Sequence, residues 1–171
     1  MIRTLAIGIL STFILACEKL PDPAAPDTPR EENNEGKENN GNDNSGETNT
    51  TMPETIKITV SGKTLPVKIE ENEATKALVA ALREASITYE AHDYGGFEKV
   101  GPLGLTLPAN NSQITTQPGD VILYSGNQIV LFYGSNTWSY TRIGKMQYGS
   151  LDELKSFLKA GEGNISVTLS L

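Results

Sequence analysis

The chain has 171 residues and a formal net charge of −7. The excess negative charge lies in residues 17–55, which hold ten acidic and three basic residues, whereas residues 56–171 hold 11 acidic and 10 basic residues. Residues 56–171 have the size of one small domain, and their nearly neutral balance, with no cluster of Lys or Arg, excludes a nucleic-acid-binding surface set by net charge.

Residues 1–16 predict an export signal. Arg3 supplies a positive start, and Leu5 to Leu15 form an apolar stretch that is shorter than the roughly 20 residues needed to span a bilayer. The stretch ends in Ile14-Leu15-Ala16-Cys17, and Cys17 is the only cysteine of the chain. This ending resembles the lipobox of bacterial lipoproteins. The resemblance implies cleavage before Cys17, lipidation of Cys17 and anchoring in the bacterial cell envelope, at the outer membrane or the cell surface. The alternative is an ordinary signal peptide with an unrelated cysteine.

Residues 17–55 predict a disordered acidic tether. Four prolines near its start favour extended backbone, and residues 31–51 contain no Val, Ile, Leu or aromatic residue. Such a composition cannot bury enough apolar surface to offset the entropy lost on ordering. We therefore expect this segment to hold a folded domain near the membrane and clear of it.

The first part of the domain predicts a hairpin and a helix. Apolar residues alternate over 56–60 and 64–70 around the turn Ser61-Gly62-Lys63. Asn72 is placed to cap a helix over 73–84, whose apolar residues recur with helical spacing. A strand follows from residue 87. Residues 93–119 are expected to form a long excursion with one short strand near 103–107.

Residues 121–143 predict three consecutive strands, over 121–125, 128–133 and 137–143. Gly126-Asn127 suits a two-residue turn, and pairing in chain order would put Phe132 opposite Trp138 and Val130 opposite Tyr140. Both faces of these strands are apolar at the centre. We therefore expect this part of the sheet to be covered on both sides.

The end of the chain predicts a second helix and a last strand. Ser150-Leu-Asp-Glu153 is a capping box, and Gly161 is placed to end the helix. The expected buried stripe of this helix is Leu151, Leu154, Phe157 and Leu158. Residues 165–171 alternate as a strand that should pair deep in the sheet. Residues 56–171 therefore predict a mainly β domain: a closed eight-stranded barrel with two helices.

Four segments in this domain carry a family resemblance: Asp93-Tyr-Gly-Gly-Phe-Glu-Lys-Val-Gly101, Gln117-Pro-Gly-Asp-Val-Ile-Leu-Tyr124, Ile129-Val-Leu-Phe-Tyr133 and Ser139-Tyr-Thr-Arg-Ile-Gly-Lys145. Together they resemble the small bacterial cyclophilin-like domain family across residues 56–171. The resemblance implies a closed eight-stranded cyclophilin-like barrel with two helices, which is a fold shared with peptidyl-prolyl isomerases.

The resemblance does not carry the isomerase motif with it. True cyclophilins present an Arg in a Phe-x-Arg pattern on an early strand, followed by a segment rich in Gln and Gly. Here the comparable Arg142, in Tyr140-Thr-Arg142, lies on a late strand, and no Gln-Gly-Gly-Asp-like segment follows. No catalytic residue is therefore assigned, and isomerase activity in the cell envelope is kept as the alternative function.

Metal and cofactor chemistry lack a sequence signal. The domain has one histidine, His92, no cysteine and scattered acids, so we expect no metal site and no cofactor. His92 precedes Asp93 and has the chemistry of a general base. Its place on an alternating strand makes a solvent-facing side chain the favoured interpretation.

Two segments are candidate binding surfaces. Trp138, Tyr140 and Arg142 alternate on one predicted strand, which would form an aromatic platform beside a cation. The alternative is that Trp138 and Tyr140 belong to the core and that Arg142 pairs with Glu98 or Asp120. The second candidate is the loop that holds Tyr94, Phe97, Glu98 and Lys99. The predicted function is a membrane-anchored, non-catalytic binding module for a peptide or small-molecule ligand.

Overall fold

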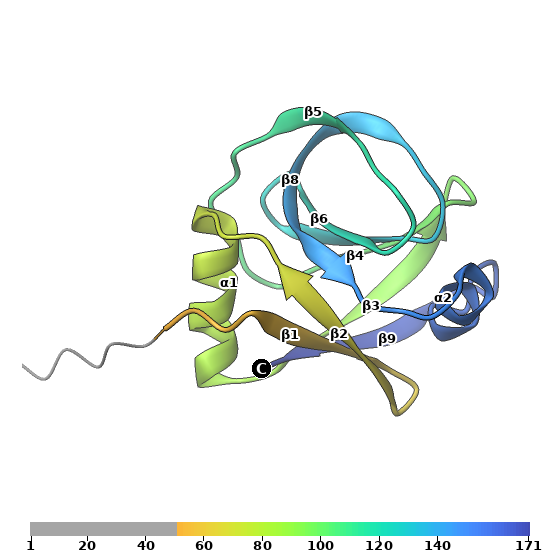
Figure 1. Ribbon diagram of the computed structural model, residues 1–171, viewed down its shortest axis with the longest axis horizontal. Coiled ribbons are helices and arrows are strands. Elements are labelled where there is room, and N and C mark those ends of the chain that lie inside the picture. Colours follow the sequence, from red (N-terminus) through yellow and green to blue (C-terminus); the bar gives the residue numbers. More distant parts are fainter. Residues whose placement is uncertain (1–50) are drawn as a thin grey trace, which may run out of the picture. The chain divides into compact units, whose positions relative to one another are not determined.

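The computed structural model describes residues 51–171 (Figure 1). The predicted export signal, Cys17 and nearly all of the predicted tether lie outside the described residues. Two helices and nine strands follow along the described chain: β1 (Thr55–Val60), β2 (Lys63–Ile69), α1 (Glu73–Glu84), β3 (Ile87–Tyr94), β4 (Glu98–Pro102), β5 (Ser112–Thr115), β6 (Asp120–Tyr124), β7 (Gln128–Phe132), β8 (Thr137–Met146), α2 (Leu151–Phe157) and β9 (Ile165–Ser170). Within residues 51–171, no helix is long and apolar enough to span a membrane.

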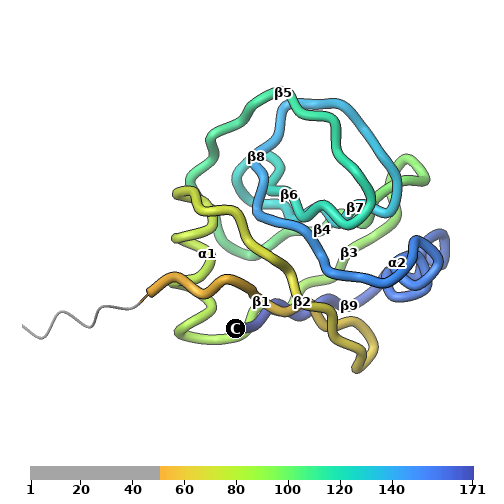
Figure 2. The backbone as a smooth tube through the Cα atoms, viewed as in Figure 1, coloured from red at the N-terminus to blue at the C-terminus, as the bar shows by residue number. Residues whose placement is uncertain are grey.

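Eight of the strands close a barrel. They follow the order β2-β1-β9-β3-β4-β7-β6-β8, and β8 pairs back onto β2, with all neighbours antiparallel. The short strand β5 pairs with the first half of β8 and lies outside this ring. In Figure 2, β5 lies at the top of the view, in a wide loop of backbone beside the first half of β8. The predicted closed eight-stranded barrel with two helices is confirmed, and β5 is an addition to it.

The two helices begin where their caps predict. Asn72 Oδ1 accepts a hydrogen bond from the Thr75 amide at 2.9 Å, and the Asn72 side-chain amide donates to the Arg142 carbonyl oxygen at 2.8 Å. The first bond satisfies a free amide at the start of α1, and the second ties α1 to β8. Ser150 caps α2 in the same way, because its hydroxyl accepts from the Glu153 amide. Of the stripe expected on α2, Leu151 is exposed, so its predicted burial is wrong.

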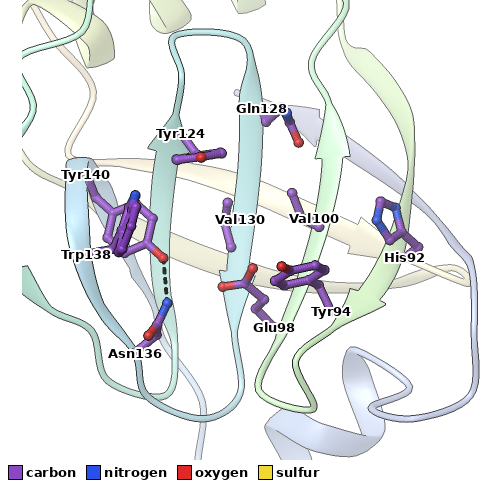
Figure 3. Close-up of a pocket in the computed structure, with 10 residues that line it drawn as sticks. All are labelled: His92, Tyr94, Glu98, Val100, Tyr124, Gln128, Val130, Asn136, Trp138 and Tyr140. Atoms are coloured by element: carbon purple, nitrogen blue, oxygen red, sulfur yellow. Dashed lines mark hydrogen bonds between the residues drawn. The ribbon is translucent and has the colours of Figure 1, made fainter. Parts of the chain in front are cut away.

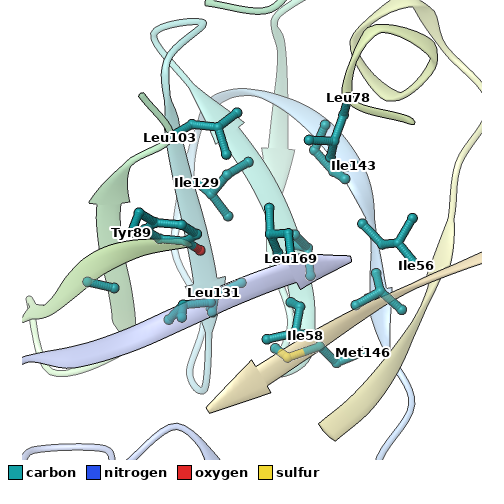
Figure 4. Packing of buried hydrophobic residues seen from close by; sticks show 14 of the residues in the cluster. Ile56, Ile58, Leu78, Tyr89, Leu103, Ile129, Leu131, Ile143, Met146 and Leu169 are labelled. Carbon is teal, nitrogen blue, oxygen red and sulfur yellow. The ribbon is translucent and has the colours of Figure 1, made fainter. Parts of the chain in front are cut away.

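The barrel interior holds the main apolar core, to which strands from both halves of the chain contribute (Figure 4). β9 lies between β1 and β3, so the last strand is an inner member of the sheet, as its regular alternation predicts. The strands approach each other closely at Gly101. A Cβ atom there would lie 2.2 Å from the Glu90 carbonyl oxygen, so this position of β4 requires glycine.

Residues 93–119 differ from the predicted excursion. They contain the end of β3 and the whole of β4 and β5, and residues 103–107 form no strand. The predicted strand near 103–107 is wrong, because backbone amides of this segment donate hydrogen bonds to a turn and not to a neighbouring strand. The Leu103 amide donates to the Asn127 carbonyl oxygen and the Leu107 amide to that of Gly126, both in the turn between β6 and β7. Burial of Leu103 and Leu107 holds this segment against the barrel.

The predicted pairing in chain order over 121–143 is also wrong. β6 lies between β7 and β8, so Phe132 does not pair with Trp138, nor Val130 with Tyr140. Tyr124 pairs with Gln128, which makes the turn three residues long. This one-residue change in register places Val121 and Leu123 inside the barrel with Ile129 and Leu131.

The same register gives the wall of the barrel a second apolar cluster on its outer face. We call it the outer cluster, and its buried members are Val100, Ile122, Val130, Phe132 and Tyr140. Phe97, Ile114 and Tyr124 pack against it while remaining partly exposed. Ile114 comes from β5, so this added strand and the first half of β8 help to cover the outer face. The prediction that both faces of this part of the sheet are covered is confirmed.

Candidate functional site

A pocket of about 530 Å³ lies on the outer face of the barrel, bordered by part of the outer cluster (Figure 3). We call it the outer pocket, and its lining residues are His92, Tyr94, Glu98, Val100, Tyr124, Gln128, Val130, Asn136, Trp138 and Tyr140. They come from β3, β4, β6, β7, β8 and the segment before β8. The volume falls in the usual range of small-molecule sites, roughly 300–1,000 Å³.

Strand alternation explains why these residues share one face. On β3 and β4, Tyr94 pairs with Glu98 and His92 with Val100, and Val100 in turn pairs with Val130 of β7. Residues directly opposite each other on neighbouring strands project to the same side of the sheet. The intervening residue Lys99 therefore points to the other side.

Glu98 is the buried charged group of the outer pocket. Its exposed fraction is 6%, and its Oε2 atom is buried without a hydrogen-bond partner among the described residues. Its cross-strand neighbours are Tyr94 on β3 and Phe132 on β7, neither of which neutralises a carboxylate. Burial raises the pKa of Glu98 to about 7 because a dehydrated carboxylate is unfavourable.

Aromatic side chains surround this carboxyl group. Tyr140 is buried and makes edge-to-face contacts with Phe132 and Tyr124, at centroid distances of 5.8 and 6.0 Å. The Tyr140 hydroxyl accepts a hydrogen bond from the Asn136 side-chain amide at 3.0 Å. Burial is also the main reason that the pKa of Tyr140 is raised. This packing holds the Tyr140 ring in one orientation.

Two further aromatic residues of the outer pocket are exposed. Trp138 has an exposed fraction of 57% and Tyr94 one of 61%. The alternative that Trp138 belongs to the core is therefore wrong, whereas Tyr140 is a core residue of the outer cluster and also lines the pocket. In the view of Figure 3, Tyr94 lies on one side of Glu98 and Trp138 on the other.

The structure thus joins residues from the two segments that the sequence singles out separately. Tyr94 and Glu98 of the first segment and Trp138 and Tyr140 of the second all line one pocket. Tyr124, Gln128 and Asn136 were not among the predicted site residues. His92 is exposed, which confirms its prediction as a solvent-facing side chain, and it also lines the pocket. Alternation of apolar and polar residues gives no signal for which strands become neighbours, and that neighbourhood is what defines this pocket.

The other predicted binding residues lie outside the lining. Arg142 Nη1 lies 2.6 Å from Asp120 Oδ2, and Arg142 Nε lies 3.4 Å from the Glu70 carboxylate. The sequence alternative in which Arg142 pairs with Asp120 is therefore what the structure shows. Phe97 stacks on Phe132 with a centroid distance of 6.2 Å and does not line the pocket.

Lys99 belongs to a separate network on the other side of the sheet. Its side chain is fully buried, and Lys99 Nζ lies 2.7 Å from Asp93 Oδ2. Asp93 also accepts hydrogen bonds from the Tyr133 hydroxyl and from the backbone amides of Gly161 and Gly163. Burial alone would raise the pKa of Asp93, but the bond from Lys99, together with these three hydrogen bonds, outweighs burial and lowers the pKa to about 2. The network fastens the loop after α2 to the β3–β4 hairpin.

The pocket offers a limited set of chemical groups. Its lining contains no Lys, no Arg and one carboxylate, Glu98. Within residues 51–171, no group of three or more His, Cys, Asp or Glu side chains is placed to hold a metal ion. What the lining provides is an aromatic surface around a buried hydrogen-bond acceptor, with amides at Gln128 and Asn136.

A family model and one solved structure agree with this architecture. The solution structure of the hypothetical protein AF2241 from Archaeoglobus fulgidus is similar in fold, with a TM-score of 0.51 and 17% sequence identity over 72% of this chain and 98% of that one. The structure of McbB in complex with tryptophan has a TM-score of 0.47 and 13% identity, over 67% of this chain and 44% of the other. No curated protein matches the chain. Residues 58–170 match the cyclophilin-like family, and the chain therefore belongs to that family.

Proposed function

We propose that the protein is an exported, lipid-anchored binding module whose outer pocket takes a peptide or small-molecule ligand. The observation that carries the binding role is the outer pocket itself. Two exposed aromatic residues line it together with the buried Glu98, whose Oε2 atom has no hydrogen-bond partner among residues 51–171. Exposed aromatic side chains at a cavity are typical of ligand sites. The anchoring role is supported by the Ile14-Leu15-Ala16-Cys17 sequence.

The isomerase alternative has less support. The Arg on which it depended, Arg142, is bound to Asp120 and Glu70 and lines no part of the outer pocket. No observation on residues 51–171 favours proline isomerisation in its place. Membership of the cyclophilin-like family describes the fold, and a fold does not by itself confer a reaction.

Binding is tested with the only tryptophan of the chain, because Trp138 lines the pocket. A panel of short peptides and small polar and aromatic molecules is titrated into the full-length chain while tryptophan emission is recorded. We expect a saturable change with at least one class, weakened by Tyr94→Ala and unaffected by Ser139→Ala, an exposed neighbour on β8. A panel with no saturable change, or binding that Tyr94→Ala leaves intact, would contradict the proposal.

Anchoring is tested separately in a bacterial host. Cells that express the full-length chain are labelled with an alkyne-bearing fatty acid and fractionated. We expect the wild-type chain to carry the label and to sediment with membranes, and Cys17→Ala to lose both properties. Unlabelled wild-type protein in the soluble fraction would show that the lipid anchor is absent, and it would leave the binding proposal unaffected.

A further inference from the structure

The carboxyl group of Glu98 lacks the partner that buried carboxylates normally have. Proteins pair or hydrogen-bond such groups because an isolated buried charge is costly. Glu98 has an exposed fraction of only 6%, and its Oε2 atom has no hydrogen-bond partner in the described part of the chain. A group from outside the chain is the natural candidate to satisfy it.

The neighbouring cations of the protein are already engaged elsewhere. Lys99, next to Glu98 in sequence, points to the other side of β4 and pairs with Asp93. Arg142 pairs with Asp120 of β6. Neither residue lines the outer pocket, so neither pairs with the ionised Glu98 carboxylate, and a positively charged ligand can do so.

The surroundings of Glu98 favour a positive group in that ligand. Tyr94, Tyr124, Trp138 and Tyr140 line the same pocket, and the faces of aromatic rings attract cations. A planar guanidinium stacks on such rings while its N–H groups donate to a carboxylate, and an ammonium group can donate in the same way. The pocket therefore combines the two features that recognise an organic cation.

We infer that the outer pocket binds the cationic end of its ligand, an ammonium or guanidinium group that donates N–H to the Glu98 carboxylate and lies against the aromatic side chains. This inference rests on the proposed binding function and names the chemical class of ligand. The cation can belong to a free small molecule or to a basic side chain of a peptide, and the experiment separates these two sources.

Binding of a cation should be coupled to the protonation of Glu98. The titratable side chains that line the outer pocket together with Glu98 are His92 and Tyr94 from β3, Tyr124 from β6 and Tyr140 from β8, and the charge of Glu98 also acts on Tyr133, which follows β7. A bound cation favours the ionised carboxylate, so below pH 7 binding should release a proton. Affinity should therefore rise with pH up to about 7. His92→Gln separates the contribution of Glu98 from that of the only histidine.

The test compares two probes that differ in charge and not in shape, N-acetylarginine amide and N-acetylcitrulline amide. Each is titrated into the full-length chain at pH 7.5, with Trp138 emission and calorimetry as readouts. We expect the arginine probe to bind at least tenfold more tightly, and proton release to appear at pH 6 in buffers of different ionisation enthalpy. A pentapeptide with arginine at its centre and free agmatine are then compared. Tighter binding of the pentapeptide identifies a peptide as the source of the cation, and tighter binding of agmatine identifies a small molecule.

Glu98→Gln keeps the shape of the side chain and removes its charge. It should reduce the preference for arginine over citrulline to about one, whereas Glu90→Gln, an exposed residue of β3 outside the pocket lining, should leave it unchanged. Equal binding of the two probes to the wild-type chain, or a preference that survives Glu98→Gln, would overturn the inference while leaving the pocket a binding site for neutral ligands. Failure of both probes to bind would also overturn the inference. The proposed binding function would then be tested only by the panel of short peptides and small molecules.

Discussion

Lys99 and Asp93 form an ion pair with 2.7 Å between Nζ and Oδ2, on the opposite side of the barrel wall from Glu98. The two residues directly oppose each other on β3 and β4, next to the pair of Tyr94 and Glu98. The same hairpin thus presents a satisfied ion pair to one side and an unsatisfied carboxyl group to the other. The first side stabilises the fold, and the second side is available to a ligand.

Removal of the buried cation should destabilise the protein. Lys99→Met leaves Asp93 without its ion-pair partner and should lower the free energy of unfolding by about 3 kcal/mol, measured by urea denaturation. Lys76→Met removes a cation from an exposed pair with Glu73 and should leave the free energy of unfolding nearly unchanged, because solvent screens such pairs. Equal effects of the two substitutions would show that the Lys99 pair has no special role in stability.

The pKa of Glu98 predicts an unusual dependence of stability on pH. The unfolded chain releases the Glu98 proton near pH 4.5 and the folded chain releases it near pH 7. Between these pH values the folded chain therefore holds a proton that the unfolded chain has lost. The contribution of Glu98 to stability is therefore fully present below about pH 4.5 and is lost as the pH rises through 7.

Glu98→Gln should remove this dependence. At pH 8 the variant should be more stable than the wild-type chain by about 2 kcal/mol, because the buried charge is gone. At pH 4 the two proteins should be nearly equal. Denaturation curves at both values check this, and a variant that is less stable than wild type at pH 8 would mean that Glu98 has a stabilising partner in solution.

The pH dependence of Asp93 has the opposite sign. Its pKa is lowered to about 2 in the folded chain, so its contribution is present above pH 3.8 and is lost as the pH falls towards 2. Asp93→Asn should therefore flatten the stability curve between about pH 4 and 2. Proton uptake on unfolding, measured by calorimetry in this range, provides the check, and an unchanged uptake in the variant would contradict the assignment.

Arg142 should act on stability rather than on binding. Arg142→Ala removes the closer of the two cations near Asp120, which is almost fully buried, and should cost about 2 kcal/mol. Lys145→Ala removes the more distant cation, at 3.6 Å, and should cost less than about 1 kcal/mol. Affinity for pocket ligands should be unchanged in both variants. A loss of affinity in Arg142→Ala at full folding would reinstate Arg142 as a binding residue.

Trp138, unlike Arg142, should act mainly on ligand binding. Because Trp138 has an exposed fraction of 57%, Trp138→Ala should lower the free energy of unfolding by only about 1 kcal/mol, well below the roughly 3–5 kcal/mol expected for a fully buried tryptophan. Affinity for a pocket ligand, followed by calorimetry, should fall about tenfold because a face of the site is removed. An unchanged affinity would indicate that ligands bind away from Trp138.

The parts of the fold that depend on local chemistry could be predicted from the sequence. Caps at Asn72 and Ser150 set the helix starts, and apolar alternation located the hairpin of β1 and β2 and the last strand. The turn after Tyr124 could not be predicted, because Ser125 adopts a positive φ of 52° that serine rarely takes. That turn sets which face of β6 enters the barrel.

The candidate site was predictable only in pieces. Aromatic residues at 94 and 138 lie far apart in the chain, and it is the order β3-β4-β7-β6-β8 that brings them to one pocket. Alternation along β8 puts Arg142 on the same outer face as Trp138, yet Arg142 forms an ion pair with Asp120 on the neighbouring strand β6. Long-range pairing therefore decides which charged residues remain available to a ligand.

The most direct measurement is an NMR titration of the side-chain carboxyl carbon of Glu98 in the full-length chain, with and without N-acetylarginine amide. We predict a midpoint near pH 7 in the free chain and a midpoint at least about one unit lower with the probe bound. A midpoint near 4.5 in the free chain, or one near 7 that the probe does not move, would contradict the assignment of Glu98 as the ligand-facing carboxyl group of the outer pocket.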